Sequence, residues 1–309
     1  MYKIKQEDAG KRLDVFLAPL ETKFSRSQLQ KLIEKEVIVV NGVAKTSHYK
    51  LKLDDEVEIL KKGLKVETQK VKVEKKNLPN IQVIFECADY IVVNKPAGLM
   101  VHGTATSTAI TLVDWLVKNY PKVKKVGEDK LRPGIVHRLD KSVSGLMVIA
   151  LNNKAFEDLK KQFQARTIDK KYIGLVYGQV SKDAGVINFN LERSSSGHKM
   201  AAKPTSQGGK EAITEFVVLE RYINFTLLEL TIKTGRTHQI RAHLSAFNHQ
   251  LVGDDWYGTV MTKTKNKKFN LGRVFLASVL LAFDNLEGER VKYELGLPAE
   301  LKKVLESVK

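Results

Sequence analysis

Short apolar runs from residue 81 onward set the expected fold. They are rich in Val, Ile, Phe and Tyr, the residue types that favour strands. Apolar residues at helical spacing lie between some of them. The expected strands are 81–85, 90–94, 144–151, 171–177, 213–220, 225–233, 274–283 and 290–295, and the expected helices are 108–120, 153–164 and 238–247. Many strands with few helices predict an α+β fold, in which helices flank a mixed, mainly antiparallel sheet.

Residues 10–60 show a shorter pattern of two helices and a hairpin. Ser25-Arg26-Ser27-Gln28 has the spacing of a capping box and apolar residues follow it at helical spacing, so a helix is expected to begin there. Asn41-Gly42 separates two apolar runs and predicts a tight hairpin turn, because positive φ costs these residues little. The pattern predicts a small α+β unit.

The stretch between these two regions is typical of a linker. Residues 61–80 are rich in lysine, lack a clear apolar period and end in Asn77-Leu78-Pro79-Asn80. We therefore expect a first domain over 1–60, a linker over 61–80 and a larger domain over 81–309. The chain of 309 residues is long enough for each domain to have its own core.

The charge balance is strongly basic. The chain has 52 Lys and Arg against 35 Asp and Glu, a formal net charge of +17. Each cation that neutralises a phosphate releases condensed counterions, so nucleic acid is the favoured partner. The alternative is a solvated basic surface with no specific partner. Basic residues of the expected helix and hairpin could straddle a phosphate backbone: Arg26, Lys31, Lys35, Lys45, Lys50 and Lys52.

Several common classes of protein are disfavoured. The GxxxxGK, GxGxxG, HExxH, paired CxxC and GxSxG motifs are absent. Cys87 is the only cysteine, so no internal disulfide can form, and no Cys/His spacing suggests a metal site. No apolar run approaches the roughly 18 residues that span a bilayer, and the first residues lack the apolar core of a signal peptide. We expect a cytoplasmic protein, with a monomer as the default.

Three segments are polar at places where a core strand should be apolar. They are Gly134–Asp140, Lys171-Tyr172 and Thr234–Arg241. An Asp at the mouth of a strand needs water or a cation, since an unpaired buried carboxylate loses its charge. A guanidinium suits this task, and three arginines could supply it: Arg138, Arg236 and Arg241. From the residues alone, Asp140 is either a nucleophile or one half of a structural salt bridge.

Five segments in order resemble a family of RNA-modifying enzymes. His137-Arg138-Leu139-Asp140 followed by Ser144-Gly145-Leu146 is similar to the signature of the RluA-type pseudouridine synthases, which include RluC- and RluD-like ribosomal RNA enzymes. The supporting segments are Asp89–Gly98, Lys171-Tyr172, Gly235–Arg241 and Gly253–Gly258. The first domain resembles the S-four-like RNA-binding domain through Arg12-Leu13-Asp14, Ser25–Gln28 and Val39–Gly42.

The resemblance implies roles for individual residues. Asp140 would be the essential catalytic aspartate, with Arg236 paired to it, and Tyr172 would stack against the target uracil. Ile240 would close the apolar side of the same pocket. Arg138 would enter the RNA as the target nucleotide leaves its stack, because a cation and an aromatic face together offset the lost stacking.

Two more residues of the same motifs, His137 and Arg241, are expected to contact the RNA. The implied reaction is an isomerisation: the uracil is cut from its ribose, turned and rejoined through ring carbon five, with no cofactor or metal. Asp140 would attack the ring, attack the sugar or take a proton from the sugar, and the sequence leaves these routes open. Large-subunit ribosomal RNA is the expected substrate, with transfer RNA as the second candidate.

Two positions depart from the family pattern. Val143 stands where Thr is usual, and Leu276-Ala277-Ser278 stands where Leu-His-Ala is common. Both are interpreted as altered packing around the site. The main alternative from another class is a non-catalytic RNA-binding or ribosome-assembly protein on the same fold. A phosphatase is disfavoured, because its second Asp would stand at Ser142.

Overall fold

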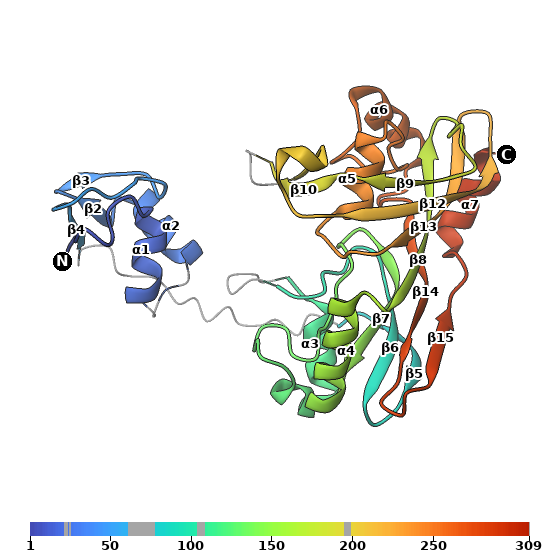
Figure 1. The fold of residues 1–309 in the computed structure, drawn as a ribbon, viewed down its shortest axis with the longest axis horizontal. Helices are drawn as coiled ribbons and strands as arrows, with labels where there is room; N and C mark the ends of the chain where they lie inside the picture. The colour runs from blue at the N-terminus through green and yellow to red at the C-terminus, as the bar shows by residue number, and fades with distance from the viewer. Residues whose placement is uncertain (22–23, 25, 61–77, 104–108, 195–198, 309) are drawn as a thin grey trace. The chain divides into compact units, whose positions relative to one another are not determined.

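The computed structural model describes residues 1–21, 24, 26–60, 78–103, 109–194 and 199–308. These residues form two compact units, one within 1–60 and one from 78 to 308, and each is considered by itself (Figure 1). No helix in the described ranges is long and apolar enough to cross a bilayer. Most of the predicted linker, 61–77, lies outside the described residues, so the domain boundary stays a prediction.

The first unit is a four-stranded sheet with two helices. The strand order is β1-β4-β2-β3. The predicted hairpin is confirmed, because Val40 pairs with Val43 while Asn41 and Gly42 turn the chain with φ of 52° and 73°. Ser25, the predicted helix cap, lies outside the described residues. The elements are β1 (Tyr2–Lys3), α1 (Leu13–Leu20), α2 (Arg26–Glu34), β2 (Ile38–Val40), β3 (Val43–Ala44) and β4 (Glu56–Ile59).

The second unit is built on a nine-stranded sheet. Its order is β5-β6-β7-β14-β8-β13-β12-β9, and β15 pairs with β14. Among the described strands of this sheet, only the pairing of β7 with β14 is parallel, which confirms the predicted fold class. The strands are β5 (Gln82–Glu86), β6 (Tyr90–Lys95), β7 (Ser144–Ala150), β8 (Asp169–Tyr177), β9 (Ala184–Asn188), β12 (Ile213–Arg221), β13 (Phe225–Ile232), β14 (Leu276–Asp284) and β15 (Arg290–Glu294). A separate hairpin pairs β10 (Asn190–Arg193) with β11 (Met200–Lys203).

Helices pack at both ends of this sheet (Figure 1). Helix α4 (Asn153–Ala165) contacts β7, whereas α5 (Gln239–Ala246) contacts β9, β11 and β12. These two and α3 (Leu112–Asn119) match the predicted helices. Helices α6 (Val260–Phe269) and α7 (Ala299–Val308) lie outside the predictions. The sequence of α6, with four lysines and three apolar residues, has no apolar period that could reveal it.

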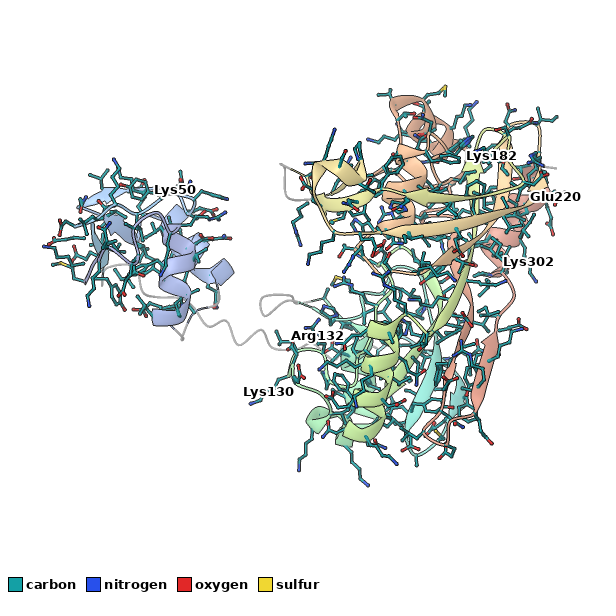
Figure 2. The ribbon with its side chains drawn as sticks, in the orientation of Figure 1. Lys50, Lys130, Arg132, Lys182, Glu220 and Lys302 are labelled. Carbon is teal, nitrogen blue, oxygen red and sulfur yellow. The ribbon has the colours of Figure 1, made fainter. Side chains whose placement is uncertain are left out.

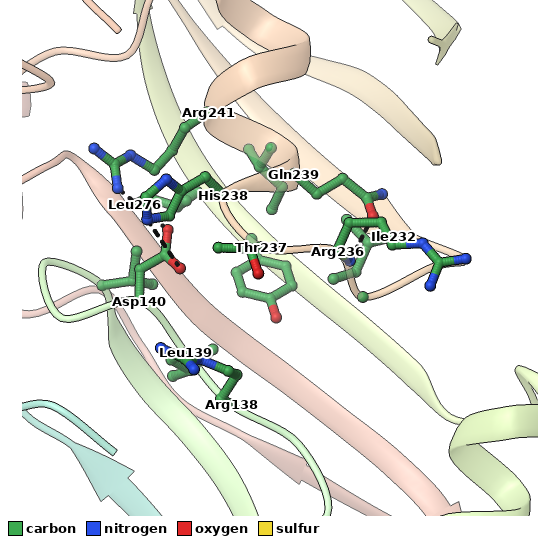
Figure 3. A pocket seen from close by; sticks show the side chains of 14 residues that line it. Arg138, Leu139, Asp140, Ile232, Arg236, Thr237, His238, Gln239, Arg241 and Leu276 are labelled. Atoms are coloured by element: carbon green, nitrogen blue, oxygen red, sulfur yellow. Dashed lines mark hydrogen bonds and ion pairs between the residues drawn. The ribbon is translucent and has the colours of Figure 1, made fainter. Parts of the chain in front are cut away.

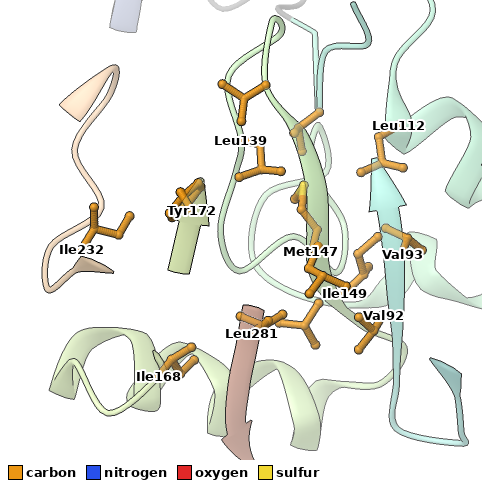
Figure 4. Close-up of a cluster of buried hydrophobic side chains, with 14 of the residues drawn as sticks. Val92, Val93, Leu112, Leu139, Met147, Ile149, Ile168, Tyr172, Ile232 and Leu281 are labelled. Carbon is orange, nitrogen blue, oxygen red and sulfur yellow. The ribbon is translucent and has the colours of Figure 1, made fainter. Parts of the chain in front are cut away.

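Strand β8 shows how the core is divided between the two faces of the sheet. Alternate side chains of a strand point to opposite faces. Tyr172 and Val176 therefore pack in the larger core with β6 and β7 (Figure 4), whereas Leu175 and Tyr177 pack on the other face with α7. Tyr172 also lines the pocket described below, so the core holds one wall of the site in place.

Candidate active site

A pocket of about 80 Å³ opens beside Asp140 (Figure 3). Its wall is formed by the loop before β7, by β8, by β14 and by the segment that joins β13 to α5. Asp140, Tyr172, Arg236 and Ile240 all line this pocket. The structure thus brings together the four residues that the resemblance assigned to the chemistry and to base binding.

Backbone contacts fix the loop that carries Asp140. The Val143 N–H donates to the Asp140 carbonyl at 3.1 Å, and the Gly98 N–H donates to the Lys141 carbonyl at 2.7 Å. Just beyond, Gly145 has φ of 120° and lies so close to β14 that a Cβ there would be 2.1 Å from the Ser278 carbonyl oxygen. Only glycine fits this approach. The Gly of the signature segment therefore lets β7 join the sheet directly after the Asp140 loop.

Arg241 is the cation that holds Asp140. Its Nη1 lies 3.3 Å from Oδ2 of Asp140. Its Nε and Nη2 donate to the two carboxylate oxygens of Asp254, at 2.7 and 2.9 Å. Arg241 and Asp254 are both buried, so these charge-assisted hydrogen bonds form with little competition from water. The guanidinium is fixed by one carboxylate and presented to the other.

The predicted pairing of Arg236 with Asp140 is wrong. The Nε of Arg236 donates to the Glu211 carbonyl at 3.1 Å, and its guanidinium points away from Asp140 (Figure 3). The backbone N–H of Arg236 donates to Oε1 of Gln239 at 3.0 Å, which fixes Arg236 in the turn before α5, whereas Arg241 lies inside that helix. Arg241 was one of the three arginines that the sequence alone allowed as the partner of Asp140.

His238 lies beside the second oxygen of the Asp140 carboxylate. Its Nε2 is 4.0 Å from Oδ1, and its Nδ1 is 3.1 Å from the Tyr257 hydroxyl. The Met200 N–H donates to that hydroxyl at 2.8 Å, which leaves the hydroxyl proton for Nδ1. Burial is the main cause that lowers the pKa of His238, with the Asp140 charge opposing it. We infer a neutral ring whose Nε2–H faces Asp140.

Tyr172 reaches the pocket from β8, where it pairs with Ser278 of β14 and Leu230 of β13. Burial raises the pKa of its hydroxyl, and the charge of Asp140 raises it further, whereas a hydrogen bond with Ser278 lowers it. The hydroxyl therefore stays protonated near neutral pH. What Tyr172 offers a ligand is an aromatic face rather than a base.

The remaining predicted site residues have different environments. Ile240 is buried in the pocket wall, as its predicted apolar role requires. Arg138 is exposed, and its Nη1 lies 3.3 Å from Nε2 of His102. In the first unit, Lys35 is exposed just after α2. The side chains of Arg26 and Lys31 lie outside the described residues.

His137 makes structural contacts and also lines a second cavity, so its contact with RNA stays a prediction. Its Nε2 accepts a hydrogen bond from the Val148 N–H at 3.0 Å, and its ring stacks on Phe163 with 4.7 Å between centroids. Burial lowers its pKa to about 3, and the charge of Lys170 acts in the same direction. A neutral ring whose Nε2 already accepts a hydrogen bond has no charge to offer a phosphate.

The depressed pKa of His137 predicts an acid-labile contribution to stability. The folded ring stays neutral down to about pH 3, whereas the unfolded ring takes up a proton below about 6.5. The contribution of His137 to the free energy of unfolding is complete above pH 6.5. It is lost as the pH falls toward 3, by at most about 1.4 kcal/mol per pH unit. Urea unfolding of wild type and His137→Gln at pH 7, 6 and 5 measures this. The stability difference between them is expected to shrink with falling pH, and a constant difference would contradict the assignment.

Three residues in or around the site were not predicted: His238, Asp254 and Lys95. Asp254 anchors Arg241, as described above. Lys95 is fully buried, and its Nζ donates to the carbonyls of Pro96 and Leu99 at 2.9 and 2.8 Å. Burial is the main cause that lowers its pKa to about 7. All three residues lie within segments that carry the resemblance, and this was the signal that could have found them.

Comparisons of sequence point to one protein family. A family model described as RNA pseudouridylate synthase matches residues 89–246. The uncharacterized RNA pseudouridine synthase YlyB of Bacillus subtilis is 36% identical over 305 residues, which cover 98% of this chain and 96% of that protein. The ribosomal large subunit pseudouridine synthase D of Pasteurella multocida is 33% identical, with 99% of this chain and 94% of that protein covered.

Solved structures agree at the level of the fold. Human RNA pseudouridylate synthase domain containing 4 aligns with a TM-score of 0.57 and 26% identity over 73% of this chain and 92% of that one. Human RNA pseudouridylate synthase domain containing 1 aligns with a TM-score of 0.56 and 25% identity over 76% of this chain and 97% of that one. Taken with the motifs and the pocket around Asp140, these matches show that the chain belongs to the RNA pseudouridylate synthase family and is an RNA pseudouridine synthase, an isomerase.

Proposed function

We propose that this enzyme isomerises a uridine of large-subunit ribosomal RNA and that Asp140 is its essential catalytic group. The observation that carries the proposal is the ion pair of Asp140 with a buried arginine in a pocket walled by Tyr172. The substrate is supported by relatives named ribosomal large subunit pseudouridine synthase D, which match nearly the whole chain.

The proposed reaction conserves atoms. The bond between N1 of uracil and C1′ of ribose breaks, the uracil turns within the pocket, and a bond forms between its C5 and C1′. The proton on C5 is released to water, and N1 takes up one proton. No electrons leave or enter, so the chemistry requires no redox cofactor. Asp140 supplies either a nucleophile or a base for the first step.

The pocket suits a base that has left its stack. Tyr172 offers an aromatic face, and Ile240 and Leu276 supply apolar walls around the ring. Stacking on an aromatic side chain is worth about 1–3 kcal/mol per base, which offsets part of the cost of extruding the nucleotide. Arg138 is exposed beside the pocket, where it can occupy the space that the base vacates.

We infer that the first unit grips the RNA as an S-four-like domain. The support is its hairpin, its two helices and its exposed basic side chains, among them Lys35, Lys50 and Lys52. Replacing these three lysines together with Glu is expected to weaken RNA binding at least tenfold at low salt and to flatten its salt dependence, because phosphate contacts release counterions. An unchanged salt dependence would contradict this role.

Release of tritium to water from ribosomal RNA labelled at carbon five of uridine tests the proposed function. The wild-type enzyme is expected to release tritium from large-subunit RNA, because the reaction exchanges the hydrogen on that carbon. Release from transfer RNA alone would keep the chemistry and overturn the substrate. No release from either RNA would favour a binding protein that has lost its chemistry.

A further inference from the structure

A second cavity, of about 500 Å³, adjoins the pocket of Asp140. The two share Arg138, Tyr172, Ile232, Gly235 and Arg236 as lining residues. The rest of this cavity, here called the basic groove, is lined by the loop that precedes Asp140, by α4 and by the first residues of β8. The two cavities therefore have one wall in common, which Tyr172 and Arg236 help to form.

The charges of the basic groove are all of one sign. Seven of its described lining residues are Lys or Arg, and none is Asp or Glu. Four of these cations have a carboxylate partner outside the groove, and one of them, Arg132, extends from the surface loop before Gly134 (Figure 2). The other three have no carboxylate partner within the described residues: Arg138, Lys170 and Arg236.

Lys170 is the unusual member of these three, because it is only 8% exposed. Its Nζ lies 5.2 Å from the centroid of the Phe163 ring, which in turn stacks on His137. Burial lowers its pKa to about 8, and no carboxylate counteracts that effect. A buried cation without an anion is costly. The fold keeps such a cation in a wall of the groove, where an anionic ligand would compensate its charge.

His102, in the same groove, adds an independent observation. Its Nε2 lies 3.3 Å from Nη1 of Arg138, and an arginine can only donate, so Nε2 accepts and Nδ1 carries the proton. That Nδ1 is buried and has no hydrogen-bond partner within the described part of the chain. His102 therefore adds an unsatisfied hydrogen-bond donor to the lining of a groove that also holds cations without anions.

We propose that the basic groove binds a backbone phosphate of the RNA next to the extruded uridine, with Lys170 as the buried cation of the site. The inference rests on the proposed function only in taking RNA as the ligand. A phosphate held by Lys170, with Arg138 and Arg236 beside it, fixes the strand on the wall that the groove shares with the pocket. The base on that strand is then positioned over Tyr172.

Salt-dependent binding of a single-stranded ribosomal RNA fragment tests the site. Lys170→Gln is expected to weaken binding and to reduce the slope of log K against log salt by about 0.7, the value for one phosphate contact on a single strand. Lys171→Gln is the matched control, because Lys171 is the next residue of β8, pairs with Glu229 at 2.7 Å and does not line the groove. A wild-type slope for Lys170→Gln, or an equal loss in the control, would overturn the proposal.

Two further measurements cover the case in which Lys170→Gln does not fold. Lys170→Arg keeps the charge and is expected to keep the wild-type slope. In the wild-type protein, nuclear magnetic resonance of the lysine ammonium groups is expected to show the Lys170 pKa rising from about 8 toward its ordinary 10.5 when RNA is added. An unchanged pKa would contradict phosphate binding. Binding is measured without turnover, so these results stand apart from those of tritium release.

Discussion

Asp140→Asn is expected to lower kcat by roughly 10⁴-fold or more, as follows from removing a group on which the chemistry depends. Asparagine has the shape of aspartate and can still accept a hydrogen bond from Arg241, so the pocket keeps its form and loses only the charge. The Kd for RNA is expected to stay within a few fold of wild type. Tritium release measures turnover, and filter binding measures affinity.

Asp183→Asn provides a matched control for that result. Asp183 is exposed and pairs with Arg221, and it lines neither the pocket nor the basic groove. This variant also replaces a carboxylate with an amide, and it is expected to keep wild-type turnover. If the Asp140 variant kept turnover within tenfold of wild type, the role of Asp140 as the essential group would be wrong.

Replacement of Arg241 is expected to have the second largest effect, on stability and on turnover together. Arg241→Met would leave Asp254, which is 1% exposed, without its cation. Breaking a buried pair in this way costs about 3–5 kcal/mol. Arg241→Lys keeps the charge but lacks the planar fork that binds Asp254 and Asp140 at once, so the carboxylate of Asp140 is less well placed. A misplacement of this kind is expected to lower kcat about 10²-fold.

Arg236→Lys is the control that separates the two arginines. The structure predicts a much larger loss of kcat for Arg241→Lys than for Arg236→Lys, because only Arg241 contacts Asp140. Chemical denaturation should likewise show a larger loss of stability for Arg241→Lys than for Arg236→Lys, since Arg236 has no buried carboxylate partner among the described residues. A larger loss of kcat in Arg236→Lys would restore the pairing that the resemblance implied.

The pattern of apolar residues was sufficient to predict much of the sheet, because buried strands require apolar side chains. Strands such as β7, whose seven residues are all buried, need continuous apolar sequence, which is visible without a structure. Helix α6 is mostly lysine, threonine and asparagine, so it lacks an apolar pattern, and its local signal is the N-cap Thr259, whose side chain accepts from the Thr262 N–H. Propensity and period are weak signals for such a segment.

The partner of Asp140 shows the limit of inference from sequence. Arg236 and Arg241 lie in the same motif, and the residues alone allowed either to reach the carboxylate. The choice depends on the turn before α5, where His238 has φ of 52° and Gln239 binds the backbone of Arg236. A change in chain direction at one residue decides which of the two side chains reaches Asp140. Spacing in a sequence does not report it.

The pairing of β7 with β14 also has a consequence for when this enzyme becomes active. It joins Ser144 to Ala277, residues about 130 positions apart, and contacts of such long range form slowly because a large loop must close first. The antiparallel pairing of β5, β6 and β7 can form earlier from nearby segments, yet it leaves the Asp140 loop without the wall that Leu276 provides. A chain still being synthesised therefore has no complete active site until β14 has emerged and docked.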